Sequence, residues 1–223
     1  MSTAELLHCV EIETASQPTA SVIWLHGLGA DGNDFAGIVP DLQLPADLAV
    51  RFVFPHAPYM PISCNNGYVM RAWYDILHFD QISRQADVAG VKASVEMIRA
   101  LIARENQRGV PSERIILAGF SQGGAIAYTA GTLHPEKLAG IVALSTYLPA
   151  PELIQAGLSN QDTPIFAAHG SADPVVGLAL GVAAKDTLSG LGFTISWQTW
   201  PMQHSVCMPE IQAIGQFIRQ RLT

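Results

Sequence analysis

The stretch from Ile115 to Gly124, IILAGFSQGG, constrains the fold more than any other part of the sequence. An apolar run of the buried-strand type leads into a serine flanked by glycines, and the apolar helical stretch Ala125–Ala130 follows at once. This order is the setting of a G-x-S-x-G elbow, whose turn holds the serine in strained backbone angles. Gly119 and Gly123 must then lack Cβ atoms so that strand and helix can approach each other. We expect Ser121 to project from a sheet edge as a nucleophile, with a simple connecting turn as the alternative.

Strand-like runs recur along the chain, and segments with helical periodicity separate most of them. Strands are expected at residues 9–12, 22–25, 51–54, 114–118, 140–144, 164–168 and 193–199. The clearest helical pattern runs from Val88 to Ile102, with its apolar residues on one face, and another follows Pro209. This alternation predicts an α/β fold with a mostly parallel central sheet and helices on both faces. In such sheets, ligands bind outside the carboxyl ends of the strands.

The composition fits one α/β domain over residues 1–223, because a chain that is 49% hydrophobic and 14% charged can bury a sizeable core. A net charge of −7 without any basic run argues against nucleic acid, whose binding relies on clustered Lys and Arg. Neither a secretory signal nor a long apolar stretch is present, so we expect a cytoplasmic protein without stable membrane insertion. Cys9, Cys64 and Cys207 are scattered and predict no disulfide framework.

The segment from Pro55 to about Gln81 is too long for an ordinary connection. It is rich in Pro, Asn and Gly and contains the aromatic stretch Trp73-Tyr-Asp75. Loops of this length are usually functional or disordered. Its aromatic residues favour packing over the mouth of an active site.

A serine hydroxyl needs a histidine to take its proton and a carboxylate to orient that histidine. In the elbow class, the acid and then the histidine follow the serine in the chain. Asp173, in HGSADPVV, comes directly after the expected strand at 164–168, and His204, in WPMQHSV, follows the last strand. We therefore expect Asp173 to be the acid and His204 the general base, both beside Ser121.

Other candidate residues fit this arrangement less well. His134 ends the elbow helix, far from the carboxyl ends of the strands, and His169 precedes the proposed acid, so both are expected to be structural. Cys64 lies in an Asn- and Gly-rich loop without a visible base. The segment His204–Cys207 could supply half of a metal site, but no second ligand pair is evident, so no metal is expected.

The segment His26–Gly32, HGLGADG, follows an apolar run and has the glycine spacing of a dinucleotide-binding loop. Such a site would need an acidic residue after the next strand, which reads RFVFPH, and Asp31 would repel a phosphate in the loop. We therefore interpret HGLG as one side of an oxyanion hole, with the backbone N–H groups of Leu28 and Gln122 as the donors. His26 is expected to form supporting hydrogen bonds.

Seven stretches together resemble one known family. They are LHGLGADGNDF, FPHAP, AWYDI, RIILAGFSQGGA, LAGIVALSTYLP, HGSADPVV and PMQHSV, in this order over nearly the whole chain. The joint pattern is similar to the carboxylesterase and acyl-protein thioesterase (lysophospholipase-like) family of α/β-hydrolases. The resemblance implies an α/β-hydrolase fold in a single domain without a large lid. It also implies a triad of Ser121, Asp173 and His204, with Leu28 and Gln122 as oxyanion donors.

Details of the resemblance favour bacterial carboxylesterases. ALSTYLP and the stretch Cys64–Tyr68 look more like bacterial enzymes than eukaryotic thioesterases, which usually have Trp at the place of Tyr147. Gln203 stands where bacterial relatives have glycine, which bears on the shape of the pocket rather than on the triad. Trp73 and Tyr147 are candidates for lining an acyl pocket, although Trp73 fits a role in the core of its loop equally well.

We therefore expect a serine hydrolase that cleaves carboxylic esters of short to medium acyl chain, and thioesters as well, through an acyl-enzyme and without a cofactor. The alternative is an acyl-protein thioesterase or lysophospholipase acting on long acyl chains, which needs a longer apolar groove. Outside this class, a non-catalytic binding module and a nucleotide-dependent oxidoreductase are the other hypotheses. The expected partner is a small-molecule acyl ester or thioester, and the family's frequent dimers suggest a homodimer, although the sequence shows no interface.

Overall fold

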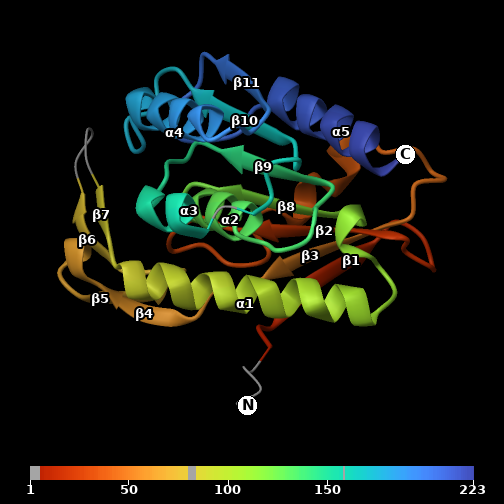
Figure 1. The fold of residues 1–223 in the computed structure, drawn as a ribbon, viewed down its shortest axis with the longest axis horizontal. Helices are drawn as coiled ribbons and strands as arrows, with labels where there is room; N and C mark the ends of the chain where they lie inside the picture. Colours follow the sequence, from red (N-terminus) through yellow and green to blue (C-terminus); the bar gives the residue numbers. More distant parts are fainter. Residues whose placement is uncertain (1–5, 80–83, 158) are drawn as a thin grey trace.

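The computed structural model describes residues 6–79, 84–157 and 159–223, and a seven-stranded sheet lies at its centre (Figure 1). The strands are β1 (Cys9–Glu13), β2 (Ala20–Leu25), β3 (Val50–Pro55), β8 (Ile115–Phe120), β9 (Gly140–Leu144), β10 (Ile165–Gly170) and β11 (Ile195–Trp200). Their order is β1-β3-β2-β8-β9-β10-β11. Only the β1–β3 pair in this sheet is antiparallel. Each of the seven predicted runs forms one of these strands, so the predicted mostly parallel sheet is confirmed.

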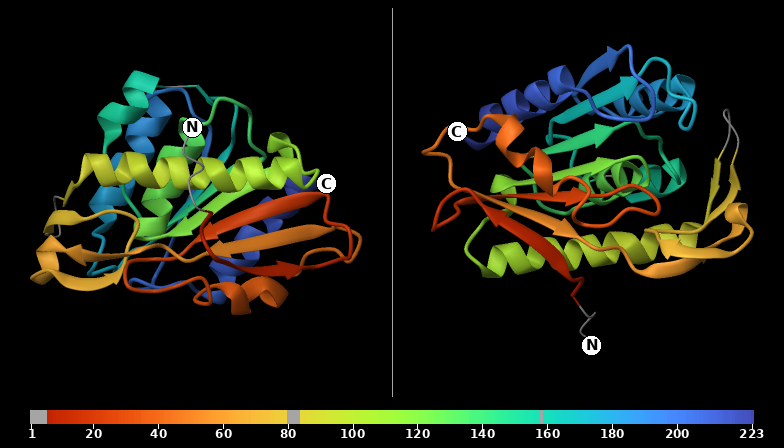
Figure 2. Two further views of the ribbon diagram at one scale, coloured as in Figure 1. Left: turned by 90° about the horizontal axis from the view of Figure 1, so that it is seen from below. Right: turned by 180° about the vertical axis from the view of Figure 1, so that it is seen from behind.

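Helices cover both faces of the sheet. They are α1 (Val88–Gln107), α2 (Gln122–Thr132), α3 (Pro151–Gly157), α4 (Leu178–Gly190) and α5 (Met208–Leu222), with the short 3-10 helices η1 (Ala36–Leu42), η2 (Ser63–Asn65) and η3 (Ser112–Arg114). The α1, α2, α3 and α4 helices pack on one face, and α5 and η1 pack on the other (Figure 2). Successive strand residues point to opposite faces of the sheet. Ile23 therefore belongs to the hydrophobic core under α1, α2, α3 and α4, whereas Val22 and Trp24 belong to the core under α5 and η1.

The long segment after β3 forms two small antiparallel sheets rather than one open loop. They pair β4 (Tyr59–Ile62) with β5 (Tyr68–Arg71), and β6 (Ile76–Phe79) with β7 (Arg84–Ala86). Both lie beside the N-terminal end of α1 (Figure 1). Between β5 and β6, Trp73 and Tyr74 are buried in the core that α1 covers. This part of the chain is therefore packed structure; residues 80 and 81 of the predicted loop lie outside the described residues.

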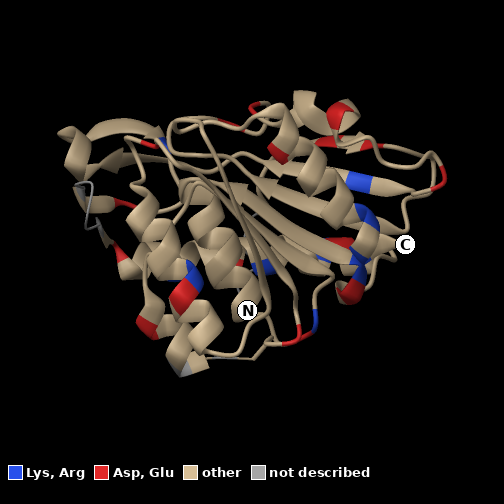
Figure 3. Cartoon of the chain, turned by 90° about the horizontal axis from the view of Figure 1, so that it is seen from above, with Lys and Arg blue, Asp and Glu red and all other residues tan. Residues whose placement is uncertain are grey.

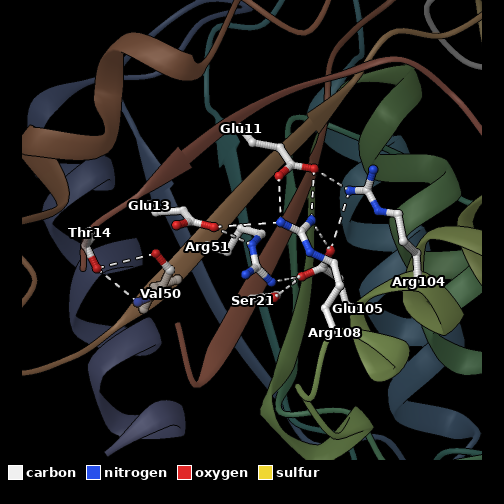
Figure 4. Close-up of polar contacts among 9 residues, drawn as sticks. All are labelled: Glu11, Glu13, Thr14, Ser21, Val50, Arg51, Arg104, Glu105 and Arg108. Carbon is white, nitrogen blue, oxygen red and sulfur yellow. Dashed lines mark hydrogen bonds and ion pairs between the residues drawn. The ribbon is translucent and has the colours of Figure 1, made fainter. Parts of the chain in front are cut away.

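A cluster of charged side chains joins the edge strand β1 to β3 and α1 (Figure 4). We call it the Glu105 cluster; its members are Glu11, Glu13, Arg51, Arg104, Glu105 and Arg108. The buried Glu105 carboxylate accepts hydrogen bonds from Ser21 Oγ (2.6 Å), Arg51 (2.9 Å) and Arg108 (3.0 Å). Burial disfavours the charged form of Glu105, but the hydrogen bonds from Ser21 and Arg51 outweigh it and lower its pKa. The cluster therefore connects the edge strand β1 to β3 and α1 through side chains.

Figure 3 colours the chain by residue type and shows positions with Lys or Arg among positions with Asp or Glu. In the described part of the chain, no helix combines the length and the apolar character needed to cross a membrane. A cytoplasmic location, the absence of nucleic-acid binding, a homodimer and one domain over residues 1–223 stay predictions.

Candidate active site

Ser121 is the single residue between β8 and α2, with φ 53° and ψ −120°. Such angles are costly for a residue with a Cβ atom and persist only where the surrounding structure fixes them. The backbone N–H of Ser121 donates to the carbonyl oxygen of Leu144 (2.9 Å), and its own carbonyl accepts from the hydroxyl of Thr146 (2.6 Å). The neighbouring strand β9 and the residues after it therefore hold the turn in place.

The backbone around the elbow leaves no room for a side chain at Gly119 or Gly123. A Cβ atom on Gly119 would lie 2.4 Å from the carbonyl group of Gly123. A Cβ atom on Gly123 would lie 2.3 Å from the carbonyl oxygen of Leu25, at the end of β2. Side-chain carbons do not approach backbone atoms so closely, so the predicted need for glycine at both positions is confirmed.

His204 connects Ser121 to Asp173 through two hydrogen bonds. Its Nε2 lies 2.9 Å from Ser121 Oγ, and its Nδ1 lies 2.7 Å from Asp173 Oδ2. Asp173 follows β10 and His204 follows β11, so parallel strands bring both residues to the edge where β8 delivers Ser121. With Nδ1–H donating to the carboxylate, Nε2 can accept the serine proton. The structure thus brings together the three side chains that the chain order predicts.

Asp173 is buried, and its carboxylate is held by more than His204. Its Oδ1 accepts hydrogen bonds from the backbone N–H groups of Val175 (2.8 Å) and Val176 (2.9 Å). Burial disfavours the charged form, but the hydrogen bonds from His204, Val176 and Val175 outweigh it and lower the pKa of Asp173. The carboxylate is therefore ionised at neutral pH and can stabilise a positive charge on His204.

A cavity of about 320 Å³ opens beside Ser121 and His204. Ligand pockets usually measure about 300–1,000 Å³, so this one is at the small end. Its other lining residues are Gly27, Leu28, Ala30, Asp34, Ile76, Phe120, Gln122 and Val175. Leu28 and Gln122, the predicted backbone donors, therefore lie at the same cavity as the serine. Gln122 is also the first residue of α2, where backbone N–H groups have no partner within the helix.

Neither Trp73 nor Tyr147 lines this cavity, so the prediction for Tyr147 is wrong and, of the two predicted places for Trp73, the structure shows the core. Trp73 is 1% exposed and belongs to the core, and its indole N–H donates to the carbonyl oxygen of His26 (2.9 Å). Tyr147 is also buried, and its hydroxyl lies 2.7 Å from that of Tyr74. Large aromatic residues fill cores as readily as they line pockets, so their residue type could not decide between the two places.

Sequence reasoning missed several residues that do line the cavity. Phe120 directly precedes Ser121, and its ring centre lies 4.7 Å from that of His204. Its place next to the nucleophile in the sequence indicates that it lies at the cavity. Val175 belongs to the HGSADPVV stretch and could have been noticed there. Ile76 lies in the long segment, where no pattern in the sequence indicates which side chains face the site.

The other histidines lie where their predicted structural roles place them. His134 is two residues beyond the end of α2, at the end away from the elbow. His169 is buried in β10, and its Nε2–H donates to the carbonyl oxygen of Val176 (2.8 Å). The Nε2 atom of His26 accepts a hydrogen bond from the backbone N–H of Ala57 (3.0 Å). Among the residues that the structure describes, no group of three or more His, Cys, Asp or Glu side chains is placed to hold a metal ion.

Known proteins resemble this chain along almost its whole length. The family model described as Phospholipase/Carboxylesterase matches residues 7–222. Acyl-protein thioesterase 1 of Neurospora crassa is 41% identical over 221 residues, which cover 95% of this chain and 90% of that protein. Acyl-protein thioesterase 1 of Gibberella zeae is 38% identical over 218 residues, 93% of each chain. The crystal structure of Arabidopsis thaliana SOBER1 has a TM-score of 0.86 at 32% identity and covers 92% of this chain and 99% of that one.

Proposed function

Because the chain belongs to the phospholipase/carboxylesterase family of α/β-hydrolases, we propose that it is a serine hydrolase that cleaves acyl thioesters and esters through an acyl-enzyme. Family membership confirms the resemblance that the seven sequence stretches indicated and the α/β-hydrolase fold. The observation that most directly supports the proposed chemistry is the hydrogen-bonded chain Ser121–His204–Asp173 beside the cavity.

In the proposed reaction, Ser121 Oγ attacks the acyl carbon while His204 Nε2 takes the hydroxyl proton. The negative oxygen that forms accepts hydrogen bonds from the backbone N–H groups of Leu28 and Gln122. Asp173 stabilises the charged imidazolium, which then protonates the leaving thiol or alcohol. Water attacks the acyl-enzyme by the same route and releases the acid. These steps need no cofactor.

Proteins carrying long-chain acyl thioesters are the proposed leading substrate class. Both fungal relatives are named acyl-protein thioesterase 1, and they support the long-acyl alternative better than the prediction of short to medium esters. The side chains of Leu28, Ile76, Phe120 and Val175 at the cavity are apolar and suit an acyl chain.

A carboxylesterase of short acyl chain is the second candidate. The observation that favours it is the small volume of the cavity, about 320 Å³. A long acyl chain would have to continue beyond the cavity along the surface. Chain-length preference therefore separates the two candidates.

The test is hydrolysis of two acyl series, p-nitrophenyl esters and S-acyl peptides, each from acetyl to palmitoyl. We expect Ser121→Ala to lower kcat by several orders of magnitude, because loss of a nucleophile of this kind removes the acyl-enzyme route. Ser189→Ala, on the exposed end of α4, is the matched control and should keep wild-type rates. A palmitoyl optimum supports the thioesterase, and an acetyl-to-hexanoyl optimum supports the carboxylesterase. Equal rates for wild type and Ser121→Ala across both series would refute the proposed function.

A further inference from the structure

Trp73 is hydrogen-bonded to both sides of the proposed oxyanion hole. Its indole Nε1–H donates to the carbonyl oxygen of His26 (2.9 Å), two residues before Leu28. Its backbone N–H donates to the side-chain oxygen of Gln122 (2.9 Å), the residue after Ser121. One buried residue outside the cavity therefore touches the two segments that supply the two N–H donors.

Further contacts hold Trp73 itself in place. The side-chain amide of Gln122 donates to the carbonyl oxygen of Tyr74 (2.7 Å), so Gln122 forms a two-bond clamp on the backbone of this segment. The hydroxyl of Ser94, in α1, donates to the carbonyl oxygen of Trp73. The ring of His26 lies against the indole, with their centres 5.3 Å apart. Trp73 is thus connected to α1, to the loop that contains His26 and Leu28, and to the first residue of α2.

The loop with the Leu28 donor needs such support. Leu28 stands between Gly27 and Gly29, and glycine restricts the backbone less than any other residue. An oxyanion hole works only when both donors lie about 2.7–3.1 Å from the developing oxyanion. A small displacement of the Leu28 loop relative to the start of α2 would therefore reduce the stabilisation of the transition state. It would affect binding of the substrate much less.

We propose that Trp73 is a positioning residue that sets the separation of the Leu28 and Gln122 backbone N–H groups through its hydrogen bonds to His26 and Gln122. This inference rests on the proposed function of the Ser121 site. It also gives a role to a buried tryptophan that does not line the cavity.

Trp24 offers a matched control. Like Trp73 it is 1% exposed, but it lies in the other core, and its indole Nε1 has no hydrogen-bond partner among the described residues. Its ring stacks on Phe35, with the ring centres 5.2 Å apart. Trp→Phe at either position keeps an aromatic ring and removes the indole N–H, so the comparison isolates the hydrogen bond to His26.

The experiment measures Tm for wild type, Trp73→Phe and Trp24→Phe. It also measures their kcat and KM on one p-nitrophenyl ester that the wild type hydrolyses. It also measures inhibition by an alkyl trifluoromethyl ketone, whose adduct with the serine carries the oxyanion. We expect Trp73→Phe to lower kcat about tenfold, to weaken the inhibitor in the same proportion and to change KM less than about twofold. Trp24→Phe should lower Tm to a similar extent and leave all three kinetic quantities at wild-type values.

Gln122→Met gives a second test that does not depend on the stability of Trp73→Phe. It removes both side-chain hydrogen bonds to the Trp73 segment and keeps the backbone N–H of residue 122, so the same loss of kcat and inhibitor affinity is expected. The inference is overturned if either folded variant matches Trp24→Phe in kcat and in inhibitor affinity. A wild-type chain without hydrolase activity would overturn the proposed function instead.

Discussion

At the scale of single residues, equal burial does not imply an equal role. Trp73 and Trp24 are both buried, yet only Trp73 has a hydrogen-bond partner for its indole N–H among the described residues. The difference arises because Trp73 lies against the carboxyl end of β2, where a carbonyl group is available, whereas Trp24 points into an apolar core. The tryptophan side chain alone predicts burial at both positions. The hydrogen-bond partners around each indole determine whether the residue can position another group.

Glu210 shows how one buried residue connects stability to pH. It lies in the first turn of α5 with no exposed surface, and burial raises its pKa from 4.5 to about 8. Between these two pH values, the unfolded chain has lost this proton while the folded chain keeps it. The free energy of unfolding must therefore fall as the pH rises through this window, and the contribution is fully present only below the lower value.

We predict that Glu210→Gln removes this dependence, because the amide has nearly the same shape and does not ionise. Between pH 5 and pH 8, the free energy of unfolding of wild type should fall relative to that of the variant by up to about 1.4 kcal/mol per pH unit. Urea unfolding at pH 5, 6.5 and 8 measures this difference. Glu113→Gln, at an exposed site, should keep the wild-type slope. Parallel pH profiles for wild type and Glu210→Gln would show that Glu210 is ionised in the fold.

At the scale of elements, the Glu105 cluster connects α1 to the edge of the sheet. Glu105→Ala would leave Arg51, whose side chain is also largely buried, without its buried partner and with only the more exposed Glu13. Removing one partner of a buried ion pair typically costs about 3–5 kcal/mol in the free energy of unfolding. We expect a loss of this size in urea unfolding at pH 7.

Glu96→Ala is the control for that prediction, because Glu96 lies on the same helix and pairs with Arg99 at the surface. Exposed pairs of this kind contribute about 0–1 kcal/mol. If both variants lose the same small amount of stability, the Glu105 cluster does not fasten β1 and β3 to α1.

The central strands could be predicted because most of them are short apolar runs; β2, β3, β8, β9 and β10 are buried along nearly their whole length, as strands of a parallel sheet with helices on both faces are. The hairpins between β3 and α1 could not be predicted in the same way. Tyr59, Tyr68 and Val69 in β4 and β5 are exposed, so no apolar pattern distinguishes these strands from loop. Their positions depend on contacts with distant parts of the chain, such as the hydrogen bond from the backbone N–H of Gly29 to the carbonyl oxygen of Arg71 (2.9 Å).

At the scale of the whole molecule, the arrangement of Ser121, Asp173 and His204 was predictable because parallel strands all end at one edge of the sheet. The lining of the cavity was not predictable, because it depends on how the loops after β2, β5 and β10 pack against one another. The chain thus combines a rigid sheet, which sets the geometry of the three side chains, with loops that shape the space for an acyl group.

Covalent labelling of Ser121 is the measurement that tests the central claim most directly. The full chain is treated with an alkyl fluorophosphonate, which reacts with activated serines, and the adduct is located by intact-protein and peptide mass spectrometry. We predict one adduct, on the peptide that contains Ser121, which is absent in Ser121→Ala and forms much more slowly in His204→Ala. An unlabelled wild-type chain, or an adduct on any other residue, would contradict the assignment of Ser121 as the nucleophile.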